Sequence, residues 1–150
     1  MSETLLLHAS TVAIDGHAVL LRGPTGAGKF DLALRLIDAG ARLVADDQSE
    51  LSRRGDRIIA RAPATIAGLI EVRGIGIVRL EALAEAPLAL VVDLVAAEAI
   101  ERLPVRRTEP ILGLSLPRIE VAPFEPSAAA KLRLALRAFT GPGLPAIIGE

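Results

Sequence analysis

The segment Gly23–Lys29 constrains the fold of this chain more than any other feature. It reads Gly-Pro-Thr-Gly-Ala-Gly-Lys and matches the phosphate-binding pattern G-x-x-x-x-G-K. A β-rich run, Ala18–Arg22, leads into it, and Lys29–Asp38 follows with helical periodicity. A strand, a glycine-rich loop and a helix in this order predict an α/β domain that binds a polyphosphate at the loop. We refer to Gly23–Lys29 as the phosphate loop.

The chemistry of phosphate binding explains why these residue types occur together. Glycines allow φ > 0 and bring the backbone close to a ligand. Consecutive N–H groups and the helix N-terminus can then point at the phosphates, and a lysine adds a full positive charge. We therefore expect a nucleoside triphosphate or a related polyphosphate to contact Gly23, Pro24, Thr25, Gly26, Ala27, Gly28, Lys29 and Phe30.

Phe30 departs from the pattern, which normally continues with Ser or Thr. The hydroxyl at that position is a ligand of Mg²⁺, and a phenyl ring cannot replace it. The N–H groups of the loop and Lys29 do not depend on the hydroxyl. The sequence therefore predicts that phosphate binding survives while Mg²⁺-dependent turnover is impaired, unless another residue takes over the metal.

Phosphoryl transfer needs carboxylates that bind Mg²⁺ and often one that accepts a proton. Asp46 and Asp47 follow the expected strand Arg42–Ala45, and Asp93 follows the apolar run Leu88–Val92, as in a Walker B strand. Two adjacent carboxylates repel one another, so that one of the pair can have a raised pKa and act as a base. A turn-opening role for the pair and a solvent-facing role for Asp93 are the simpler alternatives, and the pattern alone leaves the choice open.

The rest of the chain predicts one domain over residues 1–150. Residues 51–80 read as short strands with tight turns, Leu88–Val95 as a buried strand, and Ile119–Val121 as another. Ser127 is expected to cap a final helix, Ala128–Phe139. Residues 141–150, rich in Pro and Gly, are expected to be a tail.

Charge and composition exclude several classes of partner. The net charge is −1, and the chain has three Phe, no Trp and no Tyr, so it lacks both the basic surface and the aromatic platforms of a nucleic-acid binder. With no Cys, disulfides and thiolate metal sites are excluded. The chain shows no secretory signal pattern, and its longest apolar run, Leu88–Ile100, is interrupted by acidic residues. We expect a cytoplasmic protein that contacts neither nucleic acid nor membrane.

Three segments together resemble the HPr serine kinase/phosphorylase family. Leu7-His8 lies at the expected distance before the phosphate loop, and Arg42–Asp47 reads Arg-Leu-Val-Ala-Asp-Asp. Glu71–Ile77 then reads Glu-Val-Arg-Gly-Ile-Gly-Ile. A phosphate loop alone is common, whereas all three segments in this order are specific to the family. The chain resembles a short form of the family that consists of the catalytic domain only.

The resemblance implies a fold, a reaction and a set of residue roles. The fold would be α/β, a P-loop-containing domain with a mixed sheet, similar to HPr kinase and PEP carboxykinase. The reaction would be ATP- or pyrophosphate-dependent phosphorylation of a serine on the phosphocarrier protein HPr, with phosphorolysis as its reverse. Asp47 would be the general base, supported by His8 and Asp46, while Lys29 holds the phosphate and Glu71 and Asp46 bind Mg²⁺. The protein would form a homo-oligomer, a hexamer in long family members.

Two departures from the family support alternative functions. Phe30 replaces the family's Ser, and Phe124–Ala128 stands where the family has an Arg-rich loop that bears on phosphorolysis. A nucleotide- or phosphate-sensing module with little catalysis is therefore one alternative. A small-molecule P-loop kinase that uses Asp93 is another, although the Asp46-Asp47 and Glu71–Ile77 segments argue against it.

Overall fold

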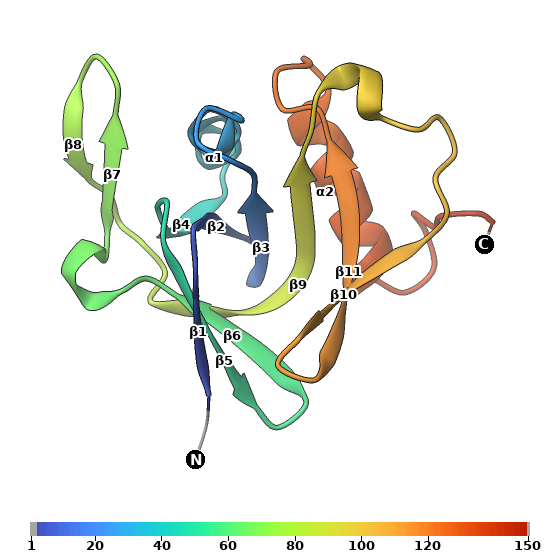
Figure 1. Cartoon of the computed structure of the whole chain (residues 1–150), viewed down its shortest axis with the longest axis horizontal. Helices are drawn as coiled ribbons and strands as arrows, with labels where there is room; N and C mark the ends of the chain where they lie inside the picture. The colour runs from blue at the N-terminus through green and yellow to red at the C-terminus, as the bar shows by residue number, and fades with distance from the viewer. Residues whose placement is uncertain (1–2, 150) are drawn as a thin grey trace.

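The structure, a computed structural model, describes residues 3–149. Within these residues the chain forms eleven strands and two α-helices (Figure 1). The strands are β1 (Thr4–Leu7), β2 (Ala9–Ile14), β3 (His17–Arg22), β4 (Arg42–Ala45), β5 (Ser49–Arg54), β6 (Arg57–Arg61), β7 (Leu69–Val72), β8 (Gly76–Arg79), β9 (Glu85–Leu94), β10 (Arg107–Ile111) and β11 (Leu114–Val121). The α-helices are α1 (Lys29–Asp38) and α2 (Ala128–Thr140), and 3-10 turns lie at Ala64–Ile66 and Ala97–Ala99.

Nine of the strands form one mixed sheet. β3 lies between β9, which is parallel to it, and β2, which is antiparallel, and β4 pairs antiparallel with β2. The long strand β9 pairs with β6 through Glu85–Pro87 and with β11 through Val91–Leu94. β10 pairs with β11, and β5 and β1 continue from β6. The four strands β3, β4, β9 and β11 therefore run in one direction, and β2 runs against them.

The central strands are buried on both faces, as predicted for the apolar run after residue 87. Leu21 of β3 and Val92 of β9 face the side on which α1 and α2 pack. Their neighbours Leu20 and Val91 face the opposite side, where residues of β5, β6, β10 and β11 cover them. All four side chains have no exposed surface. Continuous apolar runs are typical of parallel strands enclosed in this way.

A separate hairpin, β7–β8, projects beside α1 on the side away from α2 (Figure 1). Ile70 and Val72 of β7 form a small buried cluster with Leu43 of β4. The ring of Phe30, in the first turn of α1, packs against this cluster. The hairpin, β4 and the helix that follows the phosphate loop are thus joined by apolar contacts.

The local predictions agree with the structure in most places. The predicted helix Lys29–Asp38 and strand Arg42–Ala45 have the bounds that the structure shows. The final helix begins at Ala128 as predicted, but the Ser127 side chain makes no capping hydrogen bond. The Ala128 N–H donates instead to the carbonyl oxygen of Glu125, at 3.1 Å, so a backbone turn begins the helix.

Strand β10 has no counterpart in the prediction. Its sequence, Arg-Thr-Glu-Pro-Ile, is polar and contains a proline, which a strand accommodates at the edge of a sheet. Of the predicted tail, residues 141–149 are described and contain neither helix nor strand, whereas residue 150, like residues 1–2, lies outside the described part. None of the helices in residues 3–149 has the length and apolar character needed to cross a membrane.

Candidate functional site

The predicted site residues meet at one edge of the sheet. The phosphate loop follows the carboxyl end of β3, and Asp46 and Asp47 follow the carboxyl end of β4. Because β2 runs in the opposite direction, His8, which precedes it, lies at the same edge. Ligands of open α/β sheets bind outside the carboxyl ends of the strands.

A cleft of about 450 Å³ opens at this edge. Its lining contains most of the residues that the sequence predicted, together with several that it did not. The lining residues are His8, Ser10, Thr25, Gly26, Gly28, Lys29, Phe30, Asp31, Asp46, Asp47, Glu71, Arg73 and Phe124. A second cavity, of about 170 Å³, lies between β10, β11 and the C-terminal segment and contains none of the predicted site residues.

The phosphate loop has the backbone conformation that its glycines allow. Gly26 and Gly28 have φ of 85° and 107°, in the left-handed region. A side chain at Gly28 would also collide with Pro123, because an added Cβ would lie 2.8 Å from Cγ of that proline. Glycine is therefore required at residue 28 by conformation and by space.

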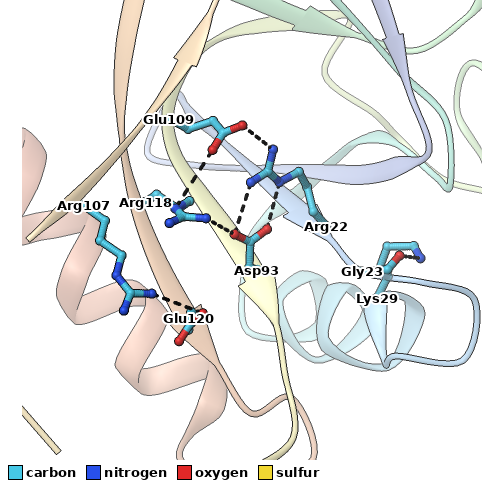
Figure 2. A network of polar contacts seen from close by, with 8 residues as sticks. All are labelled: Arg22, Gly23, Lys29, Asp93, Arg107, Glu109, Arg118 and Glu120. Atoms are coloured by element: carbon cyan, nitrogen blue, oxygen red, sulfur yellow. Dashed lines mark hydrogen bonds and ion pairs between the residues drawn. The ribbon is translucent and has the colours of Figure 1, made fainter. Parts of the chain in front are cut away.

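Lys29 is directed into the loop. Its Nζ donates to the carbonyl oxygen of Gly23, at 2.5 Å (Figure 2). It also donates to the carbonyl oxygen of Pro24, at 3.2 Å, and the residue is only 6% exposed. An ammonium group has three N–H donors, so one remains in addition to these two. The positive charge is thereby held at the concave side of the loop, where a phosphate group would approach.

His8 and Asp47 form a direct pair across the cleft. Nε2 of His8 lies 2.7 Å from Oδ1 of Asp47, and both side chains are about half exposed. The backbone of Asp47 is held as well, because its N–H donates to Oγ of the buried Ser10 at 2.9 Å. Asp47 adopts φ of 66°, a left-handed conformation that Asp tolerates better than most residues. His8 thus contacts the carboxylate and Ser10 holds the backbone of Asp47, while 61% of the Asp47 side chain stays exposed.

Asp46 points to the β7–β8 hairpin. Its Oδ2 accepts a hydrogen bond from the backbone N–H of Glu71, at 3.1 Å. Burial raises the pKa of Asp46 above its ordinary value, and the nearby carboxylates of Asp47 and Glu71 raise this pKa further, against the opposing effect of the hydrogen bond. The sequence linked a raised pKa in the acidic pair to the role of base; the pKa of Asp46 is raised, whereas the resemblance names Asp47 as the base.

The carboxylates of the cleft suit Mg²⁺ only together with the phosphates of a bound substrate. Among residues 3–149, no three His, Asp or Glu side chains are arranged as a metal site. Mg²⁺, however, is commonly bound by one or two carboxylates together with substrate phosphates. Asp46 and Glu71 lie beside each other in the cleft, since Oδ2 of Asp46 accepts from the Glu71 backbone N–H, and Asp47 lines the same cleft. This donor set fits a phosphate-bound Mg²⁺.

Phe30 has two roles in the structure. It lines the cleft at the position where a phosphate loop normally carries a metal-binding hydroxyl. It also packs against the buried cluster that Leu43 forms with Ile70 and Val72 of the hairpin that carries Glu71. The phenyl ring therefore replaces a metal ligand by an apolar contact that supports the neighbouring carboxylate.

Asp93 has a different environment and does not line the cleft. Its carboxylate accepts from Nε and Nη2 of Arg22, at 2.8 and 3.1 Å, and from Nη1 of Arg118, at 3.2 Å (Figure 2). Glu109 accepts from Nη1 of Arg22 at 2.9 Å and extends this network to β10. The network joins β3, β9, β10 and β11, and it occupies the acceptor positions that a metal would need.

Ser10, Asp31 and Phe124 line the cleft but were not among the site residues that the sequence predicted. Ser10 holds the backbone of Asp47, and no motif marks it. Phe124 follows the carboxyl end of β11, and its place at the site follows from the rule that the ends of parallel strands meet at one edge. That inference requires the pairing of β11 with β9, which the sequence does not reveal.

The chain is similar to known proteins over most of its length. Residues 1–132 match the family model described as the HPr Serine kinase C-terminal domain. The HPr kinase/phosphorylase of Bordetella pertussis is 36% identical over 131 residues, which cover 79% of this chain and 42% of that protein. The HPr kinase/phosphorylase of Exiguobacterium sibiricum is 43% identical over 79 residues, which cover 52% of this chain and 25% of that protein. The chain thus spans less than half the length of these curated relatives.

A solved structure has the same fold. The Hpr(Ser) kinase/phosphatase from Coxiella burnetii superposes with a TM-score of 0.78 and 29% sequence identity. The superposition covers 89% of this chain and 94% of that chain. The predicted fold class, an α/β domain with a mixed sheet similar to HPr kinase, is confirmed.

Proposed function

This chain belongs to the HPr serine kinase C-terminal domain family, as its motifs predicted, and on that premise we propose that it is a protein-serine kinase. Its phosphoryl donor would be ATP or pyrophosphate. Its acceptor would be a serine of HPr or of a homologous phosphocarrier. We propose that the chain acts in the cytoplasm as a homo-oligomer, with a hexamer as the form expected from the family.

Donor binding is assigned to the phosphate loop. The left-handed glycines at residues 26 and 28 let successive N–H groups face the phosphates, and the N-terminus of α1 adds its partial positive charge. The ammonium of Lys29, already on the inner side of the loop, would exchange its carbonyl contacts for phosphate oxygens. Catalysis of phosphoryl transfer consists largely of such positioning and charge neutralisation.

Proton transfer is assigned to Asp47. The Oγ–H of the acceptor serine would give its proton to the Asp47 carboxylate while Oγ bonds to the γ-phosphorus of ATP and the bond from that phosphorus to ADP breaks. Asp47 is 61% exposed by side chain, which leaves room for a serine carried by another protein. The contact with His8 and the hydrogen bond from the Asp47 N–H to Ser10 orient the carboxylate for this step.

Mg²⁺ is assigned to Asp46 and Glu71 together with the phosphates of the donor. When bound there, the ion would neutralise charge on the phosphates. The chain itself contributes two carboxylates that a backbone hydrogen bond and the apolar cluster around Phe30 hold next to each other.

The observation that carries the proposal is that one cleft contains the ammonium of Lys29 and the His8–Asp47 pair. The test is phosphorylation of a purified HPr-like carrier with ATP and with pyrophosphate, in the presence of Mg²⁺, with phosphoserine identified by mass spectrometry. We expect transfer by the unsubstituted chain, however slow, and none by Lys29→Ala. Asp56→Asn, in the exposed turn between β5 and β6, is the matched control and should retain the activity. The absence of phosphoserine with both donors would contradict the kinase assignment.

A second candidate function is a nucleotide- or phosphate-sensing module with little catalysis. The observation that favours it is Phe30, which removes the metal-binding hydroxyl but leaves the backbone of the loop and Lys29 in place. Both candidates predict binding of ATP or pyrophosphate, and only the kinase predicts turnover. The third candidate, a small-molecule kinase that uses Asp93, has no such support, because two arginines hold that carboxylate outside the cleft.

A further inference from the structure

Phe124 is an exposed aromatic residue in the nucleotide cleft. It lies three residues beyond Val121, directly after Pro123, and 69% of its surface is exposed. The rings of the other two phenylalanines have partners within the protein, although Phe30 also lines the cleft. Phe30 packs into the cluster beneath the hairpin, and the ring of Phe139 lies 5.8 Å from the guanidinium of Arg106. Phe124 thus offers an uncovered aromatic ring to whatever enters the cleft.

The backbone around Phe124 is fixed although its ring is exposed. The guanidinium of Arg35, on α1, donates to the carbonyl oxygens of Pro123 and Glu125, the residues on either side of Phe124. The N–H of Glu125 donates to the carbonyl oxygen of Ala122 at 3.2 Å and forms a turn. The segment is therefore tied to the same helix that begins at the phosphate loop. Because this backbone is held, only the rotamer of the Phe124 side chain remains to be ordered when a ligand stacks on the ring, and this limits the entropy lost.

The ring lies beside the last glycine of the phosphate loop. A Cβ added at Gly28 would be 3.0 Å from Cζ of Phe124, so the ring edge touches the backbone at that residue. The N–H groups of the loop can bind the phosphates, and the ammonium of Lys29 can neutralise part of their charge. The loop offers no contact for the nucleoside, which is attached to the phosphates and must extend from them along the wall of the cleft.

We propose that Phe124 stacks on the base of a nucleoside triphosphate whose phosphates occupy the phosphate loop, an assignment that rests on the proposed function. The ring then makes the cleft selective for nucleotides over inorganic polyphosphates, because only a nucleotide carries a π-face. Stacking tolerates different bases, since every base has such a face. Donor choice between ATP and pyrophosphate is thereby set by a residue outside the phosphate loop.

The first test compares two ligands that differ in the nucleoside. Affinities of the unsubstituted chain and of Phe124→Ala for ATP and for inorganic tripolyphosphate are measured by calorimetry. We expect Phe124→Ala to bind ATP roughly 5- to 150-fold more weakly, the range that corresponds to loss of one stacked base. Its affinity for tripolyphosphate should stay within about twofold. Equal losses for both ligands, or no loss for ATP, would overturn the stacking role while leaving the phosphate site intact.

The second test uses the composition of the chain, which has no Trp. Phe124→Trp introduces a single indole whose fluorescence should be quenched by ATP and not by tripolyphosphate. Phe139→Trp, which lines the other cavity, is the matched control and should respond to neither ligand. An unchanged emission of Phe124→Trp at saturating ATP would contradict the proposal. If the unsubstituted chain bound neither ATP nor tripolyphosphate, the phosphate site itself would be refuted, and the stacking role with it.

Discussion

The imidazole Nε2 of His8 lies 2.7 Å from the carboxylate Oδ1 of Asp47, although 39 positions separate the two residues in the chain. The antiparallel pairing of β2 with β4 brings them together, because the start of one strand meets the end of the other. The same pairing places Ser10 under the backbone N–H of Asp47. The geometry of the proposed base is therefore a property of this strand pair.

The first prediction concerns that carboxylate. Asp47→Asn keeps the shape of the side chain but cannot accept the proton of the acceptor serine, so carrier phosphorylation should fall by about 10²- to 10⁴-fold. Nucleotide affinity should change little, because binding is assigned to the phosphate loop. Rates and affinities are measured side by side in the Phe30→Ser background. If Asp47→Asn left the rate of carrier phosphorylation unchanged while Asp93→Asn lowered it, the general base would be Asp93 instead.

The second prediction concerns Lys29 and ligand-induced stability. A ligand at about 100 times its Kd stabilises the native state by about 2.7 kcal/mol if it binds only that state. ATP or pyrophosphate should therefore raise the Tm of the unsubstituted chain, and Lys29→Ala should lose most of this increase. Each variant is compared with itself, with and without ligand, because Lys29 also holds two loop carbonyls. An unchanged Tm of the unsubstituted chain at millimolar ATP and pyrophosphate would contradict the binding site.

The third prediction concerns Phe30: its replacement should raise the reaction rate and lower the stability of the fold. Phe30→Ser restores a hydroxyl for Mg²⁺, and the Mg²⁺-dependent rate should rise by roughly tenfold or more. The same change removes a half-buried ring that packs against the cluster of Leu43, Ile70 and Val72, and we expect it to lower the free energy of unfolding by about 1–3 kcal/mol. Rates are compared well below the Tm of both proteins, and unfolding is followed by urea denaturation. Equal Mg²⁺-dependent rates would show that Asp46 and Glu71 suffice for the metal.

The fourth prediction is a pH dependence that arises from Asp46. Burial and the neighbouring carboxylates raise the pKa of Asp46 in the folded state above its ordinary value of 3.8. An acid whose pKa is raised by folding destabilises the folded state once pH exceeds the unfolded pKa, and its ionisation has no such effect at lower pH. Asp46→Asn should therefore raise the Tm near neutral pH, in the absence of Mg²⁺ and nucleotide, and the difference should vanish toward about pH 3. Thermal unfolding of both proteins across this range gives the test, and a Tm difference that grows on acidification would contradict it.

The fifth prediction separates Asp93 from catalysis. Asp93→Asn weakens contacts with Arg22 and Arg118, two guanidinium groups that are mostly buried. We expect a loss of about 1–3 kcal/mol in the free energy of unfolding, less than for a fully buried pair because all three side chains retain some exposure. Nucleotide affinity should remain, since Asp93 does not line the cleft. Calorimetric binding and urea denaturation are measured on the same sample, and lost affinity with unchanged stability would restore a ligand-binding role to Asp93.

The elements nearest the phosphate loop could be predicted from the sequence because their signals are local. The helix Lys29–Asp38 and the strand Arg42–Ala45 are specified by periodicity and by flanking glycines within a few residues of each end. The phosphate loop is recognised from the consecutive residues Gly23–Lys29 alone, and these residues also determine its chemistry. The family assignment adds three short segments in a fixed order, which also requires no knowledge of tertiary contacts.

The relationships between distant segments depend on strand order and register, which local patterns do not encode. Asp93 has the sequence context of a Walker B carboxylate, yet the pairing of β9 with β3 and β11 surrounds it with two arginines. Phe30 contradicts its motif, and only the docking of β7 beside β4 shows that its ring has apolar partners. The sequence by itself thus determined which groups are available for phosphate chemistry. The tertiary structure decided which of them share a cleft, because a side chain's partners are set by whichever strands lie next to its own.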